Sequence, residues 1–518
     1  MAQLSLLSHA DTFNRVLGCR DTFLVEIVRE GLSLAAFEPS ILDRLQADID
    51  LDGKQAKKVR IMDQIWQQEQ LPRFPDWVDH LAPADFDPVP VERFELEGGR
   101  PRAVDAELLL VLIIANGVFP LTSADGYDRL VGSEAFQAVL GHRPAPKRST
   151  VAKYLQLVSE ETRALIHRAL YRKVQTEGLD DFAELTADST AIAANTKWPT
   201  DSRLIYGFLN RIHRLLERQM KYTGVPYKSK LVDRWLEQLH RLEAAISLVR
   251  PTPGARSERG RLYRELFRVA DKTVAKLREL LGRRRDEIEM VCILPSQRLR
   301  VDRMLRDIDT AFDGAARTLV AARSRILSNR NVPAPEKAFS LADQDAYMIE
   351  KGDREPVVGY KPQLGRSGNG FISCFEVMPG NPADSDRLVP LVRRHAENTG
   401  ASLVMVSTDD GYSSSDNLNQ LAQMGVETVS FSGAKGRTVL GDDIYYADCC
   451  RLLRNDRSAV ESMIFTMKHK MSLRRFCRRG LKGVTADMSE AVLAYNLWRI
   501  AYVRRQRGPC AKVTAAAG

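Results

Sequence analysis

FAELTAD, residues 182–188, decides the fold class of this 518-residue chain. Small and apolar side chains lead up to the carboxylate of Asp188, and a short run of this kind predicts a buried β-strand that ends in an acidic group. A second run, SLVMVSTDDGY (residues 402–412), ends its apolar part at Asp409 and Asp410. Because parallel strands carry functional groups at their C-terminal ends, the two runs predict carboxylates at one edge of an α/β sheet.

Strand and helix patterns alternate around the second run. VVGYKPQLG (residues 357–365) and GFISCFEVMPG (residues 370–380) predict a hairpin, and VETVSFSG (residues 426–433) predicts a further strand. A helical pattern lies between the hairpin and the second run, and another follows VETVSFSG up to about residue 503. Alternation of this kind indicates an α/β layered domain.

Helical periodicity fills the remaining segments. AELLLVLIIANGV (residues 106–118) is shorter than the ~20 residues that span a bilayer, so it predicts a buried helix. KRSTVAKYL (residues 147–155) predicts a helix capped by Ser149 or Thr150, whose basic start fits either phosphate contacts or a solvated face. The Arg-rich helices after about residue 204 leave the same two readings open, DNA backbone contact or a charged surface.

These patterns predict five segments. They are a helical N-terminal region (1–90), a helical domain for which DNA binding is one reading (91–180), an α/β core (181–198 plus 346–505), a basic helical insertion (199–345) and a flexible tail (506–518).

Composition narrows the functional classes. The formal net charge of +9 attracts polyanions, of which nucleic acid is the commonest large one in a cell. Seven cysteines without a CxxC pair, and no secretory leader, favour a reducing cytoplasm. No apolar stretch is long enough to predict a membrane role. The sequence has no G-x-S-x-G, G-x-x-x-x-G-K-[ST] or H-E-x-x-H motif, so neither a small-molecule hydrolase nor a nucleotide cofactor is expected.

Three acidic residues have distinctive settings: Asp188 and Asp409 end predicted strands, and Glu461 lies in the predicted helix RNDRSAVESMIFTMK (residues 454–468). Clustered carboxylates repel one another unless hard cations lie between them. Two Mg²⁺ ions about 4 Å apart would activate a water or a 3′-hydroxyl and stabilise the leaving oxygen of a phosphodiester. Spacing alone does not establish such a site, because the chain has 67 Asp and Glu residues and most acids lie on solvated faces.

The motifs around these acids resemble those of DDE-type insertion-sequence transposases. Residues 409–412, Asp-Asp-Gly-Tyr, resemble the Asp-x-Gly-Tyr second motif. The third motif of these enzymes is Tyr-x2-Arg-x3-Glu-x6-Lys, and Arg457, Glu461 and Lys468 stand at its last three positions. Arg454 stands where the family has tyrosine, which leaves the role of that position open.

Further segments extend the resemblance to about residues 100–503. ELTADST (184–190), VVGYKPQLG and VMPGNPADSDRLVPLV (377–392) resemble the strands and the connecting segment that precede the second motif. NTKWPTDSRLIYGFLNRIHRL (195–215) resembles the Pro-Thr-Asp-Ser segment of the group labelled ISNCY.

The resemblance implies a ribonuclease-H-like α/β core with a mostly helical N-terminal region and an all-α insertion after the first core strand. It implies Asp188, Asp409 and Glu461 as catalytic residues and as ligands of two Mg²⁺ ions, with Mn²⁺ as a substitute. The Asp-x-Gly-Tyr register favours Asp409 over Asp410 as the second ligand.

Basic and aromatic residues are expected to contact DNA. Arg457 and Lys468 could meet phosphate from the face of Glu461, and surface ion pairing is the alternative for both. Trp198 could stack on an unpaired base, or it could be a core or interdomain tryptophan. The remaining residues expected at DNA are Lys361, Lys470, Arg474 and Arg475.

The expected function is that of a DNA transposase of an insertion sequence, which binds terminal inverted repeats and catalyses metal-dependent strand cleavage and strand transfer. Two alternatives remain: a non-catalytic DNA-binding protein derived from a transposase, and an endonuclease or resolvase without the joining step. The expected partner is double-stranded DNA, with a homodimer when DNA is bound, in the bacterial cytoplasm and associated with the nucleoid.

Overall fold

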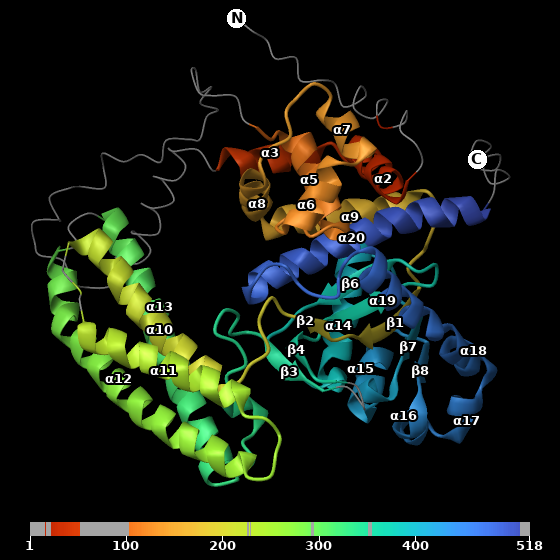
Figure 1. Ribbon diagram of the computed structural model, residues 1–518. Coiled ribbons are helices and arrows are strands. Elements are labelled where there is room, and N and C mark those ends of the chain that lie inside the picture. The colour runs from red at the N-terminus through yellow and green to blue at the C-terminus, as the bar shows by residue number, and fades with distance from the viewer. Residues whose placement is uncertain are drawn as a thin grey trace, which may run out of the picture.

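A computed structural model describes residues 16, 22–51, 103–224, 227, 229–291, 295–350 and 355–507. Most of the described residues are helical, and a mixed five-stranded sheet combines one strand near residue 185 with four strands from the C-terminal half (Figure 1). No helix among the described residues is long and apolar enough to cross a membrane.

The sheet has the strand order β6-β5-β1-β7-β8. Its central strand β1 pairs in parallel with β7, which pairs in parallel with β8, whereas β5 is antiparallel to both β1 and β6. This mixed sheet is compatible with a ribonuclease-H-like core. The strands are β1 (Glu184–Ser189), β5 (Gln363–Arg366), β6 (Ile372–Glu376), β7 (Met405–Thr408) and β8 (Thr428–Phe431).

The structure confirms the predicted hairpin only from Gln363 onward. QLGR and ISCFE form the antiparallel pair β5–β6, but the VVGY segment is strand β4 (Val357–Tyr360) of a second, small sheet. There β4 lies between β2 (Ile192–Ala193) and β3 (Tyr347–Ile349). The break falls at Lys361-Pro362, since proline has no N–H to donate to a continuous ladder.

Helices cover both faces of the five-stranded sheet. On one face, Leu185 and Ala187 belong to a hydrophobic cluster with residues of α14 (Leu388–Thr399) and α15 (Ser415–Gln423). On the other face, the strand residues Leu364 and Ile372 join a larger cluster. It includes residues of α9 (Glu160–Thr176), α19 (Ser458–Lys470) and α20 (Gly480–Arg507). Three short helices extend from the β8 edge: α16 (Gly433–Leu440), α17 (Asp442–Tyr446) and α18 (Asp448–Asp456).

The N-terminal helices pack against α20, which runs between them and the sheet (Figure 1). Helix α5 (Ala106–Val118) is buried, as predicted. The predicted cap at Ser149 or Thr150 is wrong, because α8 begins at Arg148 and its N-cap, Lys147, makes no side-chain capping bond. The other helices here are α2 (Phe23–Phe37), α3 (Ser40–Asp50), α6 (Ala124–Val131), α7 (Glu134–Leu140), α8 (Arg148–Leu157) and α9.

A buried ionic network fastens α20 to its neighbours. The carboxylate of Glu490 accepts from Arg163 of α9 at 3.0 Å and from Arg478 at 2.9 Å. Arg478 also donates to Asp487 at 2.9 Å. All of these charges are paired, which is what allows them to be buried.

Between β2 and β3 the described residues form four long helices with a hydrophobic cluster of their own. They lie beside the sheet domain as an elongated body, shown in yellow to green in Figure 1. These helices are α10 (Asp201–Thr223), α11 (Lys230–Leu248), α12 (Ala255–Val291) and α13 (Pro295–Leu327). A short 3₁₀ turn, η3 (Ala334–Glu336), follows them.

Candidate active site

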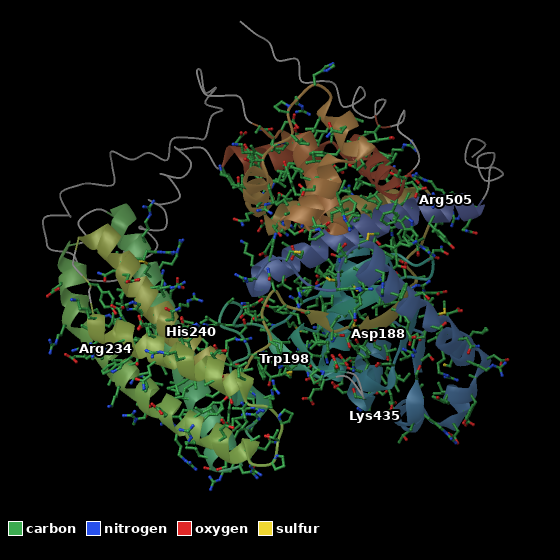
Figure 2. The ribbon with its side chains drawn as sticks, in the orientation of Figure 1. Asp188, Trp198, Arg234, His240, Lys435 and Arg505 are labelled. Atoms are coloured by element: carbon green, nitrogen blue, oxygen red, sulfur yellow. The ribbon has the colours of Figure 1, made fainter. Side chains whose placement is uncertain are left out.

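Two carboxylates emerge side by side at the C-terminal edge of the sheet. Asp188 is the fifth residue of β1 and is buried, and its Oδ1 accepts a hydrogen bond from the Ser189 N–H at 2.7 Å. Asp409 follows β7 directly. In the parallel pair β1–β7, Ala187 lies opposite Thr408, so the next residues of the two strands are neighbours. Figure 2 labels Asp188 within this part of the core.

A tight turn fixes the second carboxylate. Asp409 caps the 3₁₀ turn η5 (Asp410–Tyr412), and its side chain accepts from the Gly411 N–H at 3.0 Å. The adjacent Asp410 is engaged elsewhere, because its Oδ1 accepts from the Gly436 N–H of α16 at 2.8 Å. The two neighbouring acids therefore have separate roles in the turn.

The hydroxyl of Tyr412 lies among the acids of the site. Burial, followed by the charges of Asp384, Asp188 and Asp409, raises the pKa of Tyr412 well above its ordinary value. The hydroxyl is therefore protonated at neutral pH and donates to Oε1 of Gln363. The charges of three carboxylates therefore act on this hydroxyl.

A polar network behind the site continues from Gln363. Its side-chain amide donates to Oδ1 of Asp384 at 2.7 Å, and Asp384 begins the 3₁₀ turn η4 (Asp384–Arg387). The Lys361 ammonium lies 3.0 Å from the same oxygen, and both charged side chains are mostly buried. The structure thus places Lys361, expected at DNA, in an ion pair behind the strand ends.

Helix α19 lies beside β1. Near its start, Ala459 lines a cavity of about 180 Å³ together with Thr186 of β1. Farther along, the Lys468 ammonium donates to the Ala191 carbonyl oxygen at 3.0 Å. Side chains alternate along a strand, so Asp188 shares the face of Thr186, toward which α19 packs.

Glu461 stands near the start of this helix and is exposed to solvent. Its side chain is 68% exposed, and its Oε1 lies 3.7 Å from the Arg457 guanidinium. No group of three or more His, Cys, Asp or Glu side chains in the described part of the chain is close enough to hold a metal ion. The structure therefore brings Asp188 and Asp409 together and leaves Glu461 on the adjacent helix.

The donor atoms at the strand ends suit a hard cation. Mg²⁺ prefers oxygen ligands and is held in proteins by one or two carboxylates together with water and substrate phosphate. Asp188 and Asp409 offer such carboxylates side by side, which fits the implied metal.

The other residues expected at DNA surround α19 or precede α10. Arg474 and Arg475 are exposed, and Arg474 donates to Nδ1 of His469 at 2.5 Å. The Lys470 ammonium lies 5.2 Å from the centroid of the Trp498 ring. Trp198 is 55% exposed and lies where the chain leaves the core for the helical body (Figure 2).

The comparison with protein families supplies independent information. Residues 329–497 match the family model described as a transposase DDE domain. The match supports a DDE-type transposase. Such a domain indicates nuclease or transposase activity, and a transposase implies DNA binding. Searches of curated proteins and of solved structures found no match.

The segment that matches the family model contains most of the candidate site. It includes Asp409 and Glu461, while Asp188 precedes it and joins it through the β1–β7 pairing. Three of its residues were missed as functional candidates from the sequence: Gln363, Asp384 and Tyr412. Each lies inside a segment that resembles the family, but their mutual contacts join β5, η4 and η5, which only the folded chain brings together.

Proposed function

We propose that this protein is the DNA transposase of an insertion sequence, which binds terminal inverted repeats, cuts the element ends and joins them to target DNA. The observation that carries the proposal is the pair Asp188 and Asp409 at the ends of adjacent parallel strands, with Glu461 on the helix beside them. The transposase DDE match supports it.

Asp188, Asp409 and Glu461 are the proposed ligands of two Mg²⁺ ions, with Mn²⁺ as a substitute. When bound, the metal supplies Lewis-acid activation of a water or 3′-hydroxyl and stabilises the leaving oxygen. Glu461 is exposed and paired with Arg457 at 3.7 Å, so it can turn toward the strand ends when substrate and metal neutralise the acids.

Basic groups around α19 hold the DNA in this proposal. Lys468 is anchored to the Ala191 carbonyl oxygen, three residues past Asp188, and its charge would contact the cut phosphate. Arg457 would exchange its contact with Glu461 for phosphate once Glu461 turns toward the metal. The exposed Arg474 and Arg475 extend the positive surface along the DNA backbone.

Two ends of an element must be cut together, so the working state is proposed to be a homodimer on double-stranded DNA. The nucleoid of the bacterial cytoplasm is where such a substrate lies. The two alternatives differ in chemistry: a DNA-binding derivative would not cut, and an endonuclease or resolvase would cut without joining.

The test is strand cleavage of labelled DNA that carries the end of the flanking element, in Mg²⁺ or Mn²⁺. Wild type should cut and join, and EDTA should abolish both reactions. D188A, D409N and E461Q should lose at least about 100-fold in rate while still binding the end, because each removes a group that acts on the reacting atoms. D410N is the matched control and should retain most activity, since Asp410 bonds to α16.

The outcomes separate the candidates. Binding of the end without cutting by wild type would favour the non-catalytic protein. Cut ends that never appear in joined products would favour the endonuclease. Equal loss in D409N and D410N would overturn the assignment of Asp409 as the second ligand.

A further inference from the structure

Helix α19 carries an exposed pair of stacked rings beyond Glu461. Phe465 is 61% exposed, and its ring stacks on His469 with centroids 4.0 Å apart and planes inclined by 20°. The buried side of the same helix is formed by Val460, Met463 and Met467. Phe465 therefore contributes little to the core of the protein, and its ring faces solvent.

The ring pair lies on the same stripe of the helix as Glu461. Glu461, Phe465 and His469 follow one another at intervals of four residues, which places them on one side of an α-helix. At 1.5 Å per residue, Phe465 lies about 6 Å along the axis from Glu461. A group stacked on the rings would thus lie within one nucleotide of the proposed site of cutting.

The surroundings of the rings are basic and polar. From Ser462 to Arg479 the sequence has one His, no Asp or Glu, and six Lys or Arg residues, of which Arg478 is buried in the network with Glu490. Arg474 donates to His469, which adds a guanidinium beside the stacked rings. The neighbours Ser462 and Thr466 are polar, so the exposed ring of Phe465 suits a single flat partner better than a protein interface.

We propose that Phe465 and His469 form a stacking platform for a base that is unpaired at the cut end of the DNA strand. This inference rests on the proposed function. It specifies that an unpaired base is the part of the DNA that contacts α19. Aromatic faces stack on any base, and the surrounding cations hold its phosphates. Stacking would fix the cut phosphate beside Glu461.

The test is a binding cycle without divalent metal, so its readout does not depend on cutting. Two labelled element ends are compared by fluorescence anisotropy, one with an unpaired base at the cut position and one with an abasic sugar there. Wild type should prefer the unpaired base by about 5-fold to 100-fold, the range that base–aromatic stacking supplies. F465A and F465L should lose this preference, and F465W should keep it.

The variants separate stacking from other roles. F465L keeps an apolar side chain on an exposed helix face, so the fold should be unaffected and only the flat ring is lost. Y446A is the matched control, because Tyr446 is an exposed aromatic residue (58%) at the end of α17. It should keep the wild-type preference.

Two results would overturn the platform. In the first, F465A keeps the preference for the unpaired base, and its loss in W198A would then assign the stacking to Trp198. In the second, F465A changes the sedimentation of the DNA-free protein, which would indicate an interface between copies. If wild type binds element ends no better than random DNA, the proposed function fails first. If wild type binds ends but F465A behaves like wild type, only the platform fails.

Discussion

Tyr412 links the acids of the candidate site to the hydrogen bonds of Gln363. The charges of Asp384, Asp188 and Asp409 act on its buried hydroxyl, which donates to Gln363, and Gln363 in turn donates to Asp384. Lys361 balances part of this negative charge at 3.0 Å. Groups that orient metal ligands without touching the metal commonly change activity by 10- to 100-fold, and under the proposed function this network would have that position.

Y412F should therefore lower the rate of DNA cleavage by about 10-fold or more and destabilise the protein by only about 1 kcal/mol. Single-turnover cleavage and urea unfolding measure the two effects. Y495F is the matched control, because the buried Tyr495 hydroxyl donates to the Gly370 carbonyl oxygen at 3.1 Å, away from the acids. Y495F should lose a similar amount of stability but should cleave DNA at the wild-type rate. Equal cleavage in both variants would contradict a positioning role for Tyr412.

The sequence could predict part of the site at this scale. Apolar runs that end in acids predicted the strand ends at Asp188 and Asp409, because that pattern is local. The contacts of Asp384, Gln363 and Lys361 could not be predicted, since they depend on how β5, η4 and η5 meet in space. For Lys361 the basic side chain suggested phosphate, whereas in the structure its charge is matched by Asp384.

At the scale of elements, the crossing of α5 and α20 depends on a glycine. A Cβ placed on Gly117 would lie 2.1 Å from the Glu490 carbonyl oxygen and 2.8 Å from Cβ of Ala494. Backbone atoms of a buried helix cannot move away easily. The two helices are therefore close enough here only because residue 117 has no side chain.

G117A should destabilise the protein by roughly 1–3 kcal/mol, because overpacking outweighs the gain of about 1 kcal/mol in helix propensity. Thermal or urea unfolding measures the change. The control is G282A in α12, where a Cβ would meet no atom within 4 Å. G282A should keep the gain in helix propensity and should therefore be slightly more stable than wild type. A neutral or stabilising G117A would mean that the two helices can separate without cost.

The observed ends of elements agree with the sequence where a local signal, such as a glycine, marks them. The helix predicted before SLVMVSTDDGY is α14, and Gly400 ends it with a left-handed φ of 67°. The break between β4 and β5 was not anticipated, although Pro362 marks it. Alternating apolar residues look alike on both sides of that proline, and only the pairing partners show that two sheets are involved.

At the scale of the whole molecule, two large hydrophobic clusters are separate. One joins the N-terminal helices, α19, α20 and one face of the sheet, and the other is formed by residues of α10 to α13. The basic composition predicted a polyanion partner, but no local signal gives the position of the helical body relative to the sheet. A cavity of about 390 Å³ lies between the helical body and β3.

A fragment of residues 199–331 should fold without the rest of the chain, because its helices bury a core of their own. Circular dichroism should show a helical spectrum and a cooperative thermal transition. Within the fragment, L239A should cost about 2–5 kcal/mol, since Leu239 is fully buried, whereas L248A at a 78% exposed position should cost little. A gradual transition, insensitive to L239A, would show that this core does not form alone.

The central position of β1 in the sheet also determines when the sheet can form during translation. β1 ends at residue 189, but its neighbours begin at residues 363 and 405. A ribosome adding about 5–20 residues per second needs roughly 10–40 s to supply them. During that interval the nascent β1 has no partner on either edge, while α10 to α13 can already fold. Glu461 is translated later still, so under the proposed function an unfinished chain lacks the complete set of acids and would not nick DNA.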